Sequence, residues 1–314
     1  MLKRCLLLFA ALLCLAGAPA RAADTGHRVF LPAVRDPGRL VVYSTTSLVP
    51  EGVPHMFIQR AGGGPAVEFK PSAAPTSVSY PRWSPDGTRI AFAAGAPGGY
   101  ELYTAAPDGS QVRRLVEVSG ILRAPIWSPD SQRIAFFQSD GPQASLYLID
   151  ADGTNLRRLT DRADPESIGS WSPDGRQIVF NRMVDLVRRL IVLDVESGGE
   201  RQIDTGEGDA YSPAWSPDGS TIAFASGAKL VAAVAPDGSG RRVLFEADPV
   251  DQLLGIAVAG WSPDGRHVAA HLLAYKRAWF QLIAADGSGS RRLETSYVVD
   301  TPSIVGSFSW GPQN

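Results

Sequence analysis

Four histidines are the residues of this chain best suited to metal chemistry. They are His27, His55, His267 and His271. His267 and His271 stand four residues apart, on one face of a predicted strand, and His55 could approach them if the two ends of the fold meet. Imidazole nitrogens beside a carboxylate could hold a divalent metal. Such a site would suit a carbohydrate-active lyase or hydrolase. Unpaired histidines are more often structural or solvated, so we predict no metal site.

Other catalytic patterns are missing from the sequence. A serine peptidase of the α/β type would need a Gly-x-Ser-x-Gly elbow, and the nearest stretch, Gly260 to Asp264, has the composition of a turn. Asp150 to Gly153 resembles the start of a calcium loop, but the glutamate that ends an EF-hand loop is missing. We therefore predict no catalytic residue, no cofactor and a protein that is not an enzyme.

Many of the aspartates belong to an internal repeat. Trp-Ser-Pro-Asp-Gly or a close variant occurs five times, and a truncated copy ends the chain. The first residues of successive copies are 44, 44, 44, 46 and 49 positions apart, so one supersecondary unit repeats along the chain. A residue that every unit shares at a turn is structural rather than a unique catalyst. We assign that role to Asp86, Asp130, Asp174, Asp218 and Asp264, and to the repeat tryptophans Trp83, Trp127, Trp171, Trp215, Trp261 and Trp310.

Each unit contains four strands joined by tight turns. Ser-Pro-Asp-Gly is a turn sequence that joins two antiparallel strands, because proline presets φ and glycine accepts a left-handed backbone. A second turn, such as Asp108-Gly109 or Asp152-Gly153, follows an apolar strand in each unit. Four-stranded units of this length are typical of propeller blades. Ser131 replaces the turn glycine in one unit, which predicts either a costly left-handed residue or a different turn.

The predicted fold class is all-β: a six-bladed β-propeller of four-stranded antiparallel blades. The first unit lacks its tryptophan strand and the C-terminus supplies one, so we predict that the last strand completes the first blade and closes a ring. The single propeller domain spans 36–314, after an N-terminal arm over 23–35. Its composite blade comprises 36–75 plus 303–314, and the full blades cover about 76–119, 120–163, 164–207, 208–253 and 254–302.

Residues 1–22 are typical of a cleaved signal peptide. Lys3 and Arg4 precede an apolar run, and Ala20 to Ala22 offers a small-residue cleavage site. A lipid anchor at Cys14 is the alternative, which the bulky Leu13 before it disfavours. Cleavage would leave 27 basic and 32 acidic residues, and this excess of acidic residues argues against nucleic acid as a partner. We expect an exported monomer, periplasmic or secreted, without a membrane span.

Together, Trp-Ser-Pro-Asp-Gly-x-x-Ile-Ala-Phe, Leu-Tyr, Asp-Gly and Arg-Arg-Leu-Thr resemble the WD-like repeats of the TolB family of β-propellers, over about 41–310. The resemblance implies an exported six-bladed propeller that binds other envelope proteins. TolB also has an N-terminal α/β domain, for which the predicted arm leaves no room. Similar repeats occur in prolyl-oligopeptidase-type peptidases and in oligogalacturonate lyases, and fold alone does not choose among these functions.

Binding in propellers usually uses the channel mouth and its loops, so residues ahead of each tryptophan strand are the candidates. They mix charged and aromatic side chains, as a recognition surface does, and ordinary loop residues are the alternative. The candidates are Ser79, Arg123, Glu166, Asp209, Tyr211 and Asp300. We predict a non-catalytic module that binds protein partners in the envelope or the extracellular space, with the metal-dependent lyase or hydrolase as the alternative function.

Polar side chains recur at two other places in the unit. Paired arginines stand on the fourth strands, at 113–114, 157–158, 241–242 and 291–292. They could form a basic rim for a polyanion, but we favour protection of strand edges from pairing with other chains. A second polar position, six residues after each repeat tryptophan, is expected to be exposed and holds Arg89, Arg133, Gln177, Thr221 and His267.

Ring closure by the last strand predicts unequal effects of trimming the two ends. Ending the chain after Val299 should lower the melting temperature far more than removing residues 23–28, because it exposes the edge of the first blade. Thermal unfolding of the two truncated proteins makes the comparison. Equal melting temperatures would refute the composite blade.

Overall fold

Nearly all regular structure in this protein is β-strand. The computed structural model describes residues 40–45, 55–60, 67–72, 78–140, 143–160, 165–275, 277–298 and 308–310. Within these ranges the one exception is a short 3-10 helix, η1 (Pro249–Asp251). No helix in the same ranges is long and apolar enough to span a membrane.

Five sheets are four-stranded antiparallel meanders, which confirms the predicted repeating unit. The first holds β4 (Val78–Trp83), β5 (Ile90–Ala96), β6 (Gly99–Ala105) and β7 (Arg113–Ser119); the second holds β8 (Ile121–Trp127), β9 (Arg133–Asp140), β10 (Gln143–Asp150) and β11 (Arg157–Arg158). The third holds β12 (Pro165–Trp171), β13 (Gln177–Val184), β14 (Val187–Asp194) and β15 (Glu200–Ile203). The fourth holds β16 (Ala210–Trp215), β17 (Ile222–Ser226), β18 (Leu230–Val234) and β19 (Arg242–Glu246); the fifth holds β20 (Leu253–Trp261), β21 (His267–Ala274), β22 (Arg277–Ala284) and β23 (Ser290–Val298).

Strands from both ends of the chain also pair. They are β1 (Leu40–Thr45), β2 (His55–Arg60), β3 (Val67–Phe69) and β24 (Phe308–Trp310), in the order β24-β1-β2-β3. The register of the terminal pair sets Val41 opposite Trp310 and Tyr43 opposite Phe308. The C-terminal tryptophan strand therefore lies beside the first strand of the chain.

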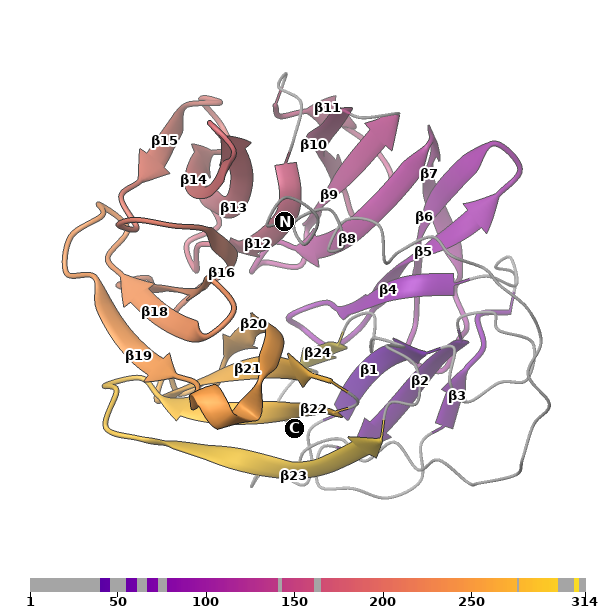
Figure 1. Ribbon diagram of the computed structural model, residues 1–314. Coiled ribbons are helices and arrows are strands. Elements are labelled where there is room, and N and C mark those ends of the chain that lie inside the picture. The colour runs from indigo at the N-terminus through magenta and orange to yellow at the C-terminus, as the bar shows by residue number, and fades with distance from the viewer. Residues whose placement is uncertain are drawn as a thin grey trace, which may run out of the picture.

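The sheets follow one another around a common centre in chain order, with the tryptophan strands innermost (Figure 1). These inner strands contact each other from blade to blade: β4 contacts β8, β8 contacts β12, β12 contacts β16, and β16 contacts β20. Both β1 and β24 contact β4. The arrangement is that of a propeller.

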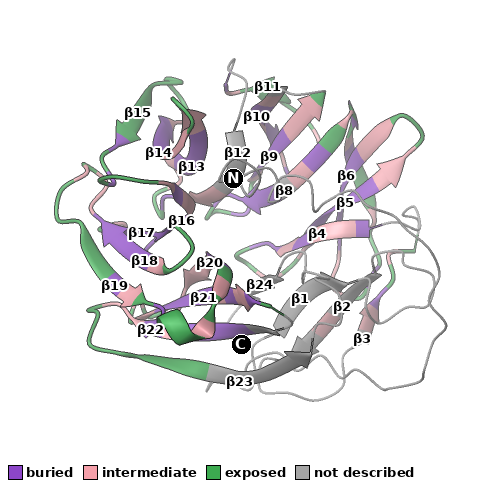
Figure 2. Ribbon diagram, in the orientation of Figure 1, coloured by how far each residue is buried: buried purple, intermediate pink, exposed green. Residues whose placement is uncertain are grey.

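The hydrophobic core is divided among the junctions between neighbouring sheets (Figure 2). Because strand side chains alternate between the two faces of a sheet, each blade buries one set against each neighbour. Ile126 of β8 and Trp171 of β12 belong to one such cluster. It also contains Phe137 and Phe180, whose rings meet edge to face with their centroids 6.2 Å apart. The predicted phenylalanines of the repeat, Phe92, Phe136, Phe180 and Phe224, are fully buried.

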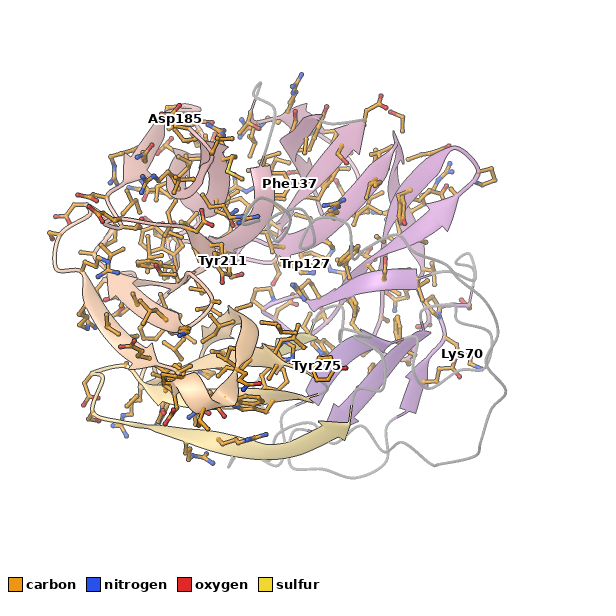
Figure 3. All side chains as sticks on the ribbon, in the orientation of Figure 1. Lys70, Trp127, Phe137, Asp185, Tyr211 and Tyr275 are labelled. Carbon is orange, nitrogen blue, oxygen red and sulfur yellow. The ribbon has the colours of Figure 1, made fainter. Side chains whose placement is uncertain are left out.

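The described repeat tryptophans lie at the junctions between successive blades. Trp83, Trp127, Trp171 and Trp215 are at most 8% exposed. Trp127 is labelled in Figure 3. The indole Nε1 of Trp127 donates to the Arg82 carbonyl of the preceding blade at 3.1 Å, and Trp261 donates to Ala214 in the same way at 2.9 Å. The side chain of Trp310 lies outside the described residues.

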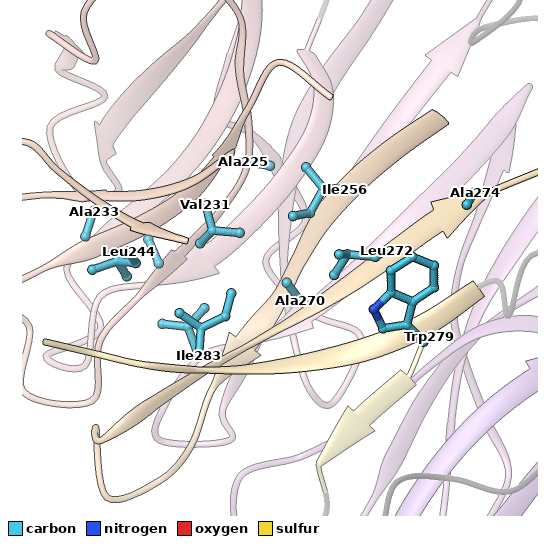
Figure 4. Close-up of a cluster of buried hydrophobic side chains, with 12 residues drawn as sticks. Ala225, Val231, Ala233, Leu244, Ile256, Ala270, Leu272, Ala274, Trp279 and Ile283 are labelled. Atoms are coloured by element: carbon cyan, nitrogen blue, oxygen red, sulfur yellow. The ribbon is translucent and has the colours of Figure 1, made fainter. Parts of the chain in front are cut away.

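Ala270 occupies the place of the repeat phenylalanine in the last full blade. Leu272 and Trp279 belong to the same buried cluster as Ala270 (Figure 4), and Trp279 is only 2% exposed. The expectation that the bulky segment 272–280 fills the space left by the missing ring is confirmed.

Ser131 adopts the left-handed backbone of the glycine it replaces. Its φ is 60°, close to the 70° of Gly175 at the equivalent position. The Ser131 hydroxyl is buried and accepts a hydrogen bond from the backbone N–H of Asp86, in the preceding blade, at 3.1 Å. This contact offsets part of the conformational cost.

Two substitutions at position 131 separate these effects. Alanine keeps the left-handed backbone but loses the acceptor, so S131A should lower the free energy of unfolding by about 1 kcal/mol. Glycine loses the same hydrogen bond but relieves roughly 1 kcal/mol of left-handed strain, so S131G should be close to wild type. Urea unfolding at neutral pH measures both values. If S131A matches wild type, the hydroxyl contact does not stabilise the fold.

Candidate functional site

The propeller has two faces of different character. One carries the Trp-Ser-Pro-Asp-Gly turns and the hairpins between third and fourth strands, and we call it the turn face. The other carries the starts of the inner strands and the hairpins between second and third strands, and we call it the mouth face. Antiparallel pairing puts the start of each inner strand on the same face as the end of the second strand. For example, Ala210, which begins β16, lies opposite Ser226, which ends β17.

Three predicted site residues occupy equivalent positions on the mouth face. Ser79, Arg123 and Tyr211 each immediately precede a β-bulge in β4, β8 and β16, where two residues oppose one on the neighbouring strand. All three side chains are partly buried. The bulges come before the repeat tryptophan in each blade and end the regular pairing, which re-aims nearby side chains.

Backbone strain accompanies two of these bulges. Tyr80 and Ser212 follow Ser79 and Tyr211, and both have positive φ, 54° and 51°. A left-handed non-glycine residue costs about 1–2 kcal/mol. Each stands before a proline, which lacks an N–H and so loses no hydrogen bond in the bulge.

Asp209 links two blades at the mouth. Its carboxylate accepts the backbone N–H of Arg188 at 2.8 Å and pairs with the Arg188 guanidinium at 3.3 Å. Arg188 belongs to β14, just after the β13–β14 hairpin, whereas Asp209 precedes β16 of the next blade. The hairpin is thereby held against the neighbouring blade.

Tyr211, labelled in Figure 3, lies close enough to Arg188 and Asp209 to interact with both charges. Its hydroxyl donates a hydrogen bond to the carbonyl of Gly227, in the β17–β18 hairpin of its own blade. Burial raises the pKa of the Tyr211 hydroxyl to about 12, and the nearby Asp209 carboxylate acts in the same direction. The phenol therefore stays protonated at neutral pH and serves as a donor rather than a base.

The structure does not bring all six candidates into one cluster. Asp209 and Tyr211 lie together, while Ser79 and Arg123 belong to other blades. The side chain of Glu166, in β12, and the whole of Asp300 lie outside the described residues. The described candidates on the mouth face are therefore separate positions, apart from one tied cluster. This cluster consists of Arg188, Asp209 and Tyr211 and lies at the junction of the β12–β15 and β16–β19 blades.

Two basic residues of this region escape sequence reasoning. Nothing local marks Arg188, because its partner Asp209 lies 21 residues away in another blade. Arg82 does carry a signal, since it is the only charged residue directly before a repeat tryptophan. Burial lowers the pKa of the Arg82 guanidinium to about 10, so an inner strand carries a cation at neutral pH.

The polar position six residues after each tryptophan is not an exposed surface position, contrary to expectation. Arg89 and Arg133 are partly buried, and each guanidinium lies over the repeat tryptophan of the next blade, 4.9 and 5.2 Å from the ring centre. Arg89 also donates to the Ser131 carbonyl at 2.8 Å. These arginines join blades, because cation–π contact and hydrogen bonding both reach across the junction.

The arginines of the fourth strands have a similar role that neither sequence interpretation anticipated. The first basic residue on each of four such strands donates to a backbone carbonyl in or beside the hairpin of the next blade. The pairs are Arg113 with Asp152 at 3.2 Å, Arg157 with Val195 at 3.0 Å, Arg201 with Pro236 at 2.6 Å and Arg242 with Ala285 at 3.3 Å. Their guanidinium groups are therefore engaged within the propeller.

His267 and His271 lie far apart on their strand, and the side chain of His55, in β2, lies outside the described residues. His267 begins β21 at the turn face, and His271 lies four residues further along, a separation of roughly 13 Å in an extended strand. His271 packs against the ring of Phe280 at 5.1 Å, and burial lowers its pKa. Among the described residues no three His, Cys, Asp or Glu side chains group as metal ligands would.

The motif aspartates are turn residues, as predicted. In each turn the serine hydroxyl donates to the aspartate, for example Ser172 to Asp174 at 2.6 Å, and the same carboxylate accepts the backbone N–H of Arg176 at 3.1 Å. These hydrogen bonds lower the pKa of Asp174. The carboxylate is thereby used to close its own turn.

Comparison with known proteins identifies a family and a fold. The family described as TolB beta propeller domain (PD40) matches residues 54–253. A search of curated protein sequences finds no match to the chain. Among solved structures, TolB from Acinetobacter baumannii superposes with a TM-score of 0.70 at 18% identity, over 88% of this chain and 67% of that one.

Two further structures share the fold at low sequence identity. The putative TolB from Agrobacterium tumefaciens gives a TM-score of 0.61 at 21% identity, over 87% of this chain and 96% of that one. The oligogalacturonate lyase from Vibrio parahaemolyticus gives 0.51 at 19% identity, over 69% of this chain and 64% of that one. At these identities the likeness is one of architecture.

The turn aspartates predict how stability depends on pH. Because the pKa of Asp174 is lowered on folding, its carboxylate stabilises the fold above the ordinary aspartate pKa, and this contribution is lost as pH falls through the folded-state pKa. Asp174→Asn keeps the acceptor oxygen but cannot titrate. Between pH 7 and about pH 3, below the ordinary aspartate pKa, wild type should therefore lose more unfolding free energy than D174N in urea titrations. Equal losses would contradict a stabilising role for the charge.

Proposed function

The chain belongs to the family of TolB β-propeller domains, and from that premise we propose that it is an exported, non-catalytic module that binds protein partners through its mouth face. The observation that carries the proposal is the tied cluster of Arg188, Asp209 and Tyr211. It presents charge, a phenol and backbone groups from two blades in a fixed arrangement. A surface that is already ordered loses less entropy when a partner binds.

The mouth face is also the more variable of the two. Equivalent positions before the bulge hold Ser79, Arg123 and Tyr211, whereas the turn face repeats one serine–aspartate network in blade after blade. Recognition surfaces mix aromatic, cationic and small polar residues. Variation on a constant scaffold is what a specific binding surface requires.

The proposed molecule is a closed ring of six blades. Support comes from the pairing of β24 with β1 and from the contacts of both strands with β4. The ring would span 36–314 after the signal peptide 1–22 and the arm 23–35, and would act as a periplasmic or secreted monomer without a cofactor. Its partners would be proteins of the envelope or the extracellular space, not nucleic acid.

A lyase or hydrolase with a metal in the channel has less support. Its histidine ligands would include His267 and His271, which belong to one strand and stand roughly 13 Å apart along it. One metal ion cannot bind both. The shared architecture with an oligogalacturonate lyase concerns the fold alone.

A paired-variant capture experiment tests the binding proposal. Immobilised residues 23–314 are exposed to envelope extract and culture fluid of the source organism, and retained proteins are quantified. Arg123→Ala with Asp209→Ala should lower the capture of a stoichiometric protein partner at least ten-fold, the equivalent of roughly 1.4 kcal/mol. Loss of the Arg188–Asp209 contact also lowers the melting temperature, so capture is measured at a temperature at which circular dichroism shows the variant to be folded.

The control changes matching charges on the turn face. Arg176→Ala with Glu196→Ala alters two exposed residues of the β12–β15 blade and should leave capture unchanged. Equal loss in both double variants, or undiminished capture by the mouth variant, would remove the mouth face as the binding surface.

A further inference from the structure

Two junctions of the propeller place an arginine over the next repeat tryptophan. Arg89 and Arg133 each stand six residues after one repeat tryptophan, and each guanidinium lies over the tryptophan ring of the following blade. The same guanidinium also donates to the carbonyl of the fourth residue after that second tryptophan, to Ser131 at 2.8 Å and to Gly175 at 3.2 Å. The protein itself therefore shows that a guanidinium fits between this ring and this carbonyl.

The junction of the β16–β19 and β20–β23 sheets is built in the same way. The indole N–H of Trp261 donates to the Ala214 carbonyl at 2.9 Å, which is the blade-to-blade contact that Trp127 makes at 3.1 Å. A Cβ added to Gly265 would lie 3.8 Å from the Cδ of Pro217, and the equivalent distance between the second and third sheets is 3.7 Å. The ring, the turn carbonyl and the spacing between the two blades are therefore those of the arginine-covered junctions.

Thr221 takes the arginine's place at this junction. Its carbonyl accepts the backbone N–H of Ser216 at 2.8 Å, as the carbonyl of Arg89 does in its own turn at 2.9 Å, but its side chain is too short to cover the ring. Among the described residues, no cationic group lies over Trp261 and no side chain donates to the Gly265 carbonyl. Trp261 is partly exposed, whereas the other four described repeat tryptophans are buried.

Carboxylates flank this position from both blades. Asp218 and Asp264 are the exposed turn aspartates of the first and second blade. Asp286, also exposed, stands 25 residues after the repeat tryptophan of its blade, as Glu196 does in the third sheet. Glu196 pairs with the Arg133 guanidinium at 2.9 Å, so a carboxylate near this position suits a guanidinium.

The arginines of the junction do not exclude a further cation. Arg242 of β19 and Arg266 of the β20–β21 turn have counterparts between the second and third sheets. These counterparts are Arg157 and Arg176, and the Arg133 guanidinium keeps its place over the tryptophan ring beside them.

We propose that the Trp261 ring, the Gly265 carbonyl and the flanking carboxylates form a binding site on the turn face for an arginine side chain of a partner protein. The partner's guanidinium takes the position that Arg89 and Arg133 take in the other blades, with its plane on the ring and an N–H donated to the carbonyl. A planar guanidinium makes both contacts at once, which a lysine ammonium does less well. This site is separate from the mouth face and goes beyond the proposed function.

Titration with two capped amino acids tests the chemistry of the site. The probes are acetyl-arginine amide and acetyl-lysine amide, added to residues 23–314 at pH 8, where histidines such as His267 are ordinarily neutral. Heteronuclear NMR follows the indole N–H resonances, and Trp261→Phe identifies the Trp261 resonance by its loss. The arginine probe should shift this resonance with a Kd at least about three-fold lower than that of the lysine probe. Equal responses to the two probes would overturn the proposal.

Two matched arginine variants locate the site. Thr221→Arg supplies the guanidinium from the chain itself, so it should abolish the response of Trp261 to the arginine probe without lowering the melting temperature. Gln177→Arg adds the same charge at the equivalent position of the preceding blade, beside Trp215, which is already buried, and should leave the response unchanged. A response that persists in T221R, or an equal loss in both variants, contradicts the assignment.

The capture experiment above distinguishes this site from the mouth face. A captured protein that T221R loses and R123A/D209A retains would remove the mouth face as the binding surface and leave the turn-face site standing. A protein that R123A/D209A loses and T221R retains in full would do the reverse. Self-association that T221R abolishes, seen by analytical ultracentrifugation, would replace the partner protein by a second copy of the chain.

Discussion

Burial of each sheet against its neighbour is the interaction on which the rest of this structure depends. A single four-stranded sheet has two apolar faces, and fully burying one large apolar side chain stabilises by about 1.5–3 kcal/mol. The repeat tryptophans and phenylalanines lie at these junctions, and indole N–H groups such as those of Trp127 and Trp261 fix the spacing by donating to the preceding blade. Each blade is stable because the next one covers it.

Arginine side chains on the turn face also contribute to these junctions. Arg89 and Arg133 cover the next tryptophan, and arginines of the outer strands donate to carbonyls of the next blade. The serine–aspartate pairs close their own turns. Because these groups already have partners, the turn face has little freedom to vary. The mouth face, where strands begin and irregular connections run, keeps that freedom.

The sequence predicts the parts of the molecule that follow from local rules. The spacing of the repeat, its turn sequences and the alternation of apolar residues along its strands predict the four-stranded unit. They also predict the buried tryptophans and the turn role of aspartates such as Asp174. The site depends on contacts between blades, which local rules do not contain. Arg188 and Asp209 are 21 residues apart, and nothing in the sequence near Arg89 indicates its contact with the tryptophan of the next blade.

Non-glycine residues with a left-handed backbone are more frequent on the mouth face than on the turn face. Of the eight non-glycine residues with positive φ in the described part of the chain, five lie on the mouth face: Tyr80, Asp185, Leu186, Ser212 and Gln252. Each costs about 1–2 kcal/mol, and Leu186 adds a side chain that is 89% exposed and gains little from folding. On the turn face, glycine fills most such positions. At Asp185 and Leu186 the fold itself requires this backbone, because Val184 pairs with Val187 and a two-residue hairpin of this kind needs a positive φ at both central residues. The conformational cost of the mouth face therefore comes from its tight hairpins and from the bulges before Pro81 and Pro213.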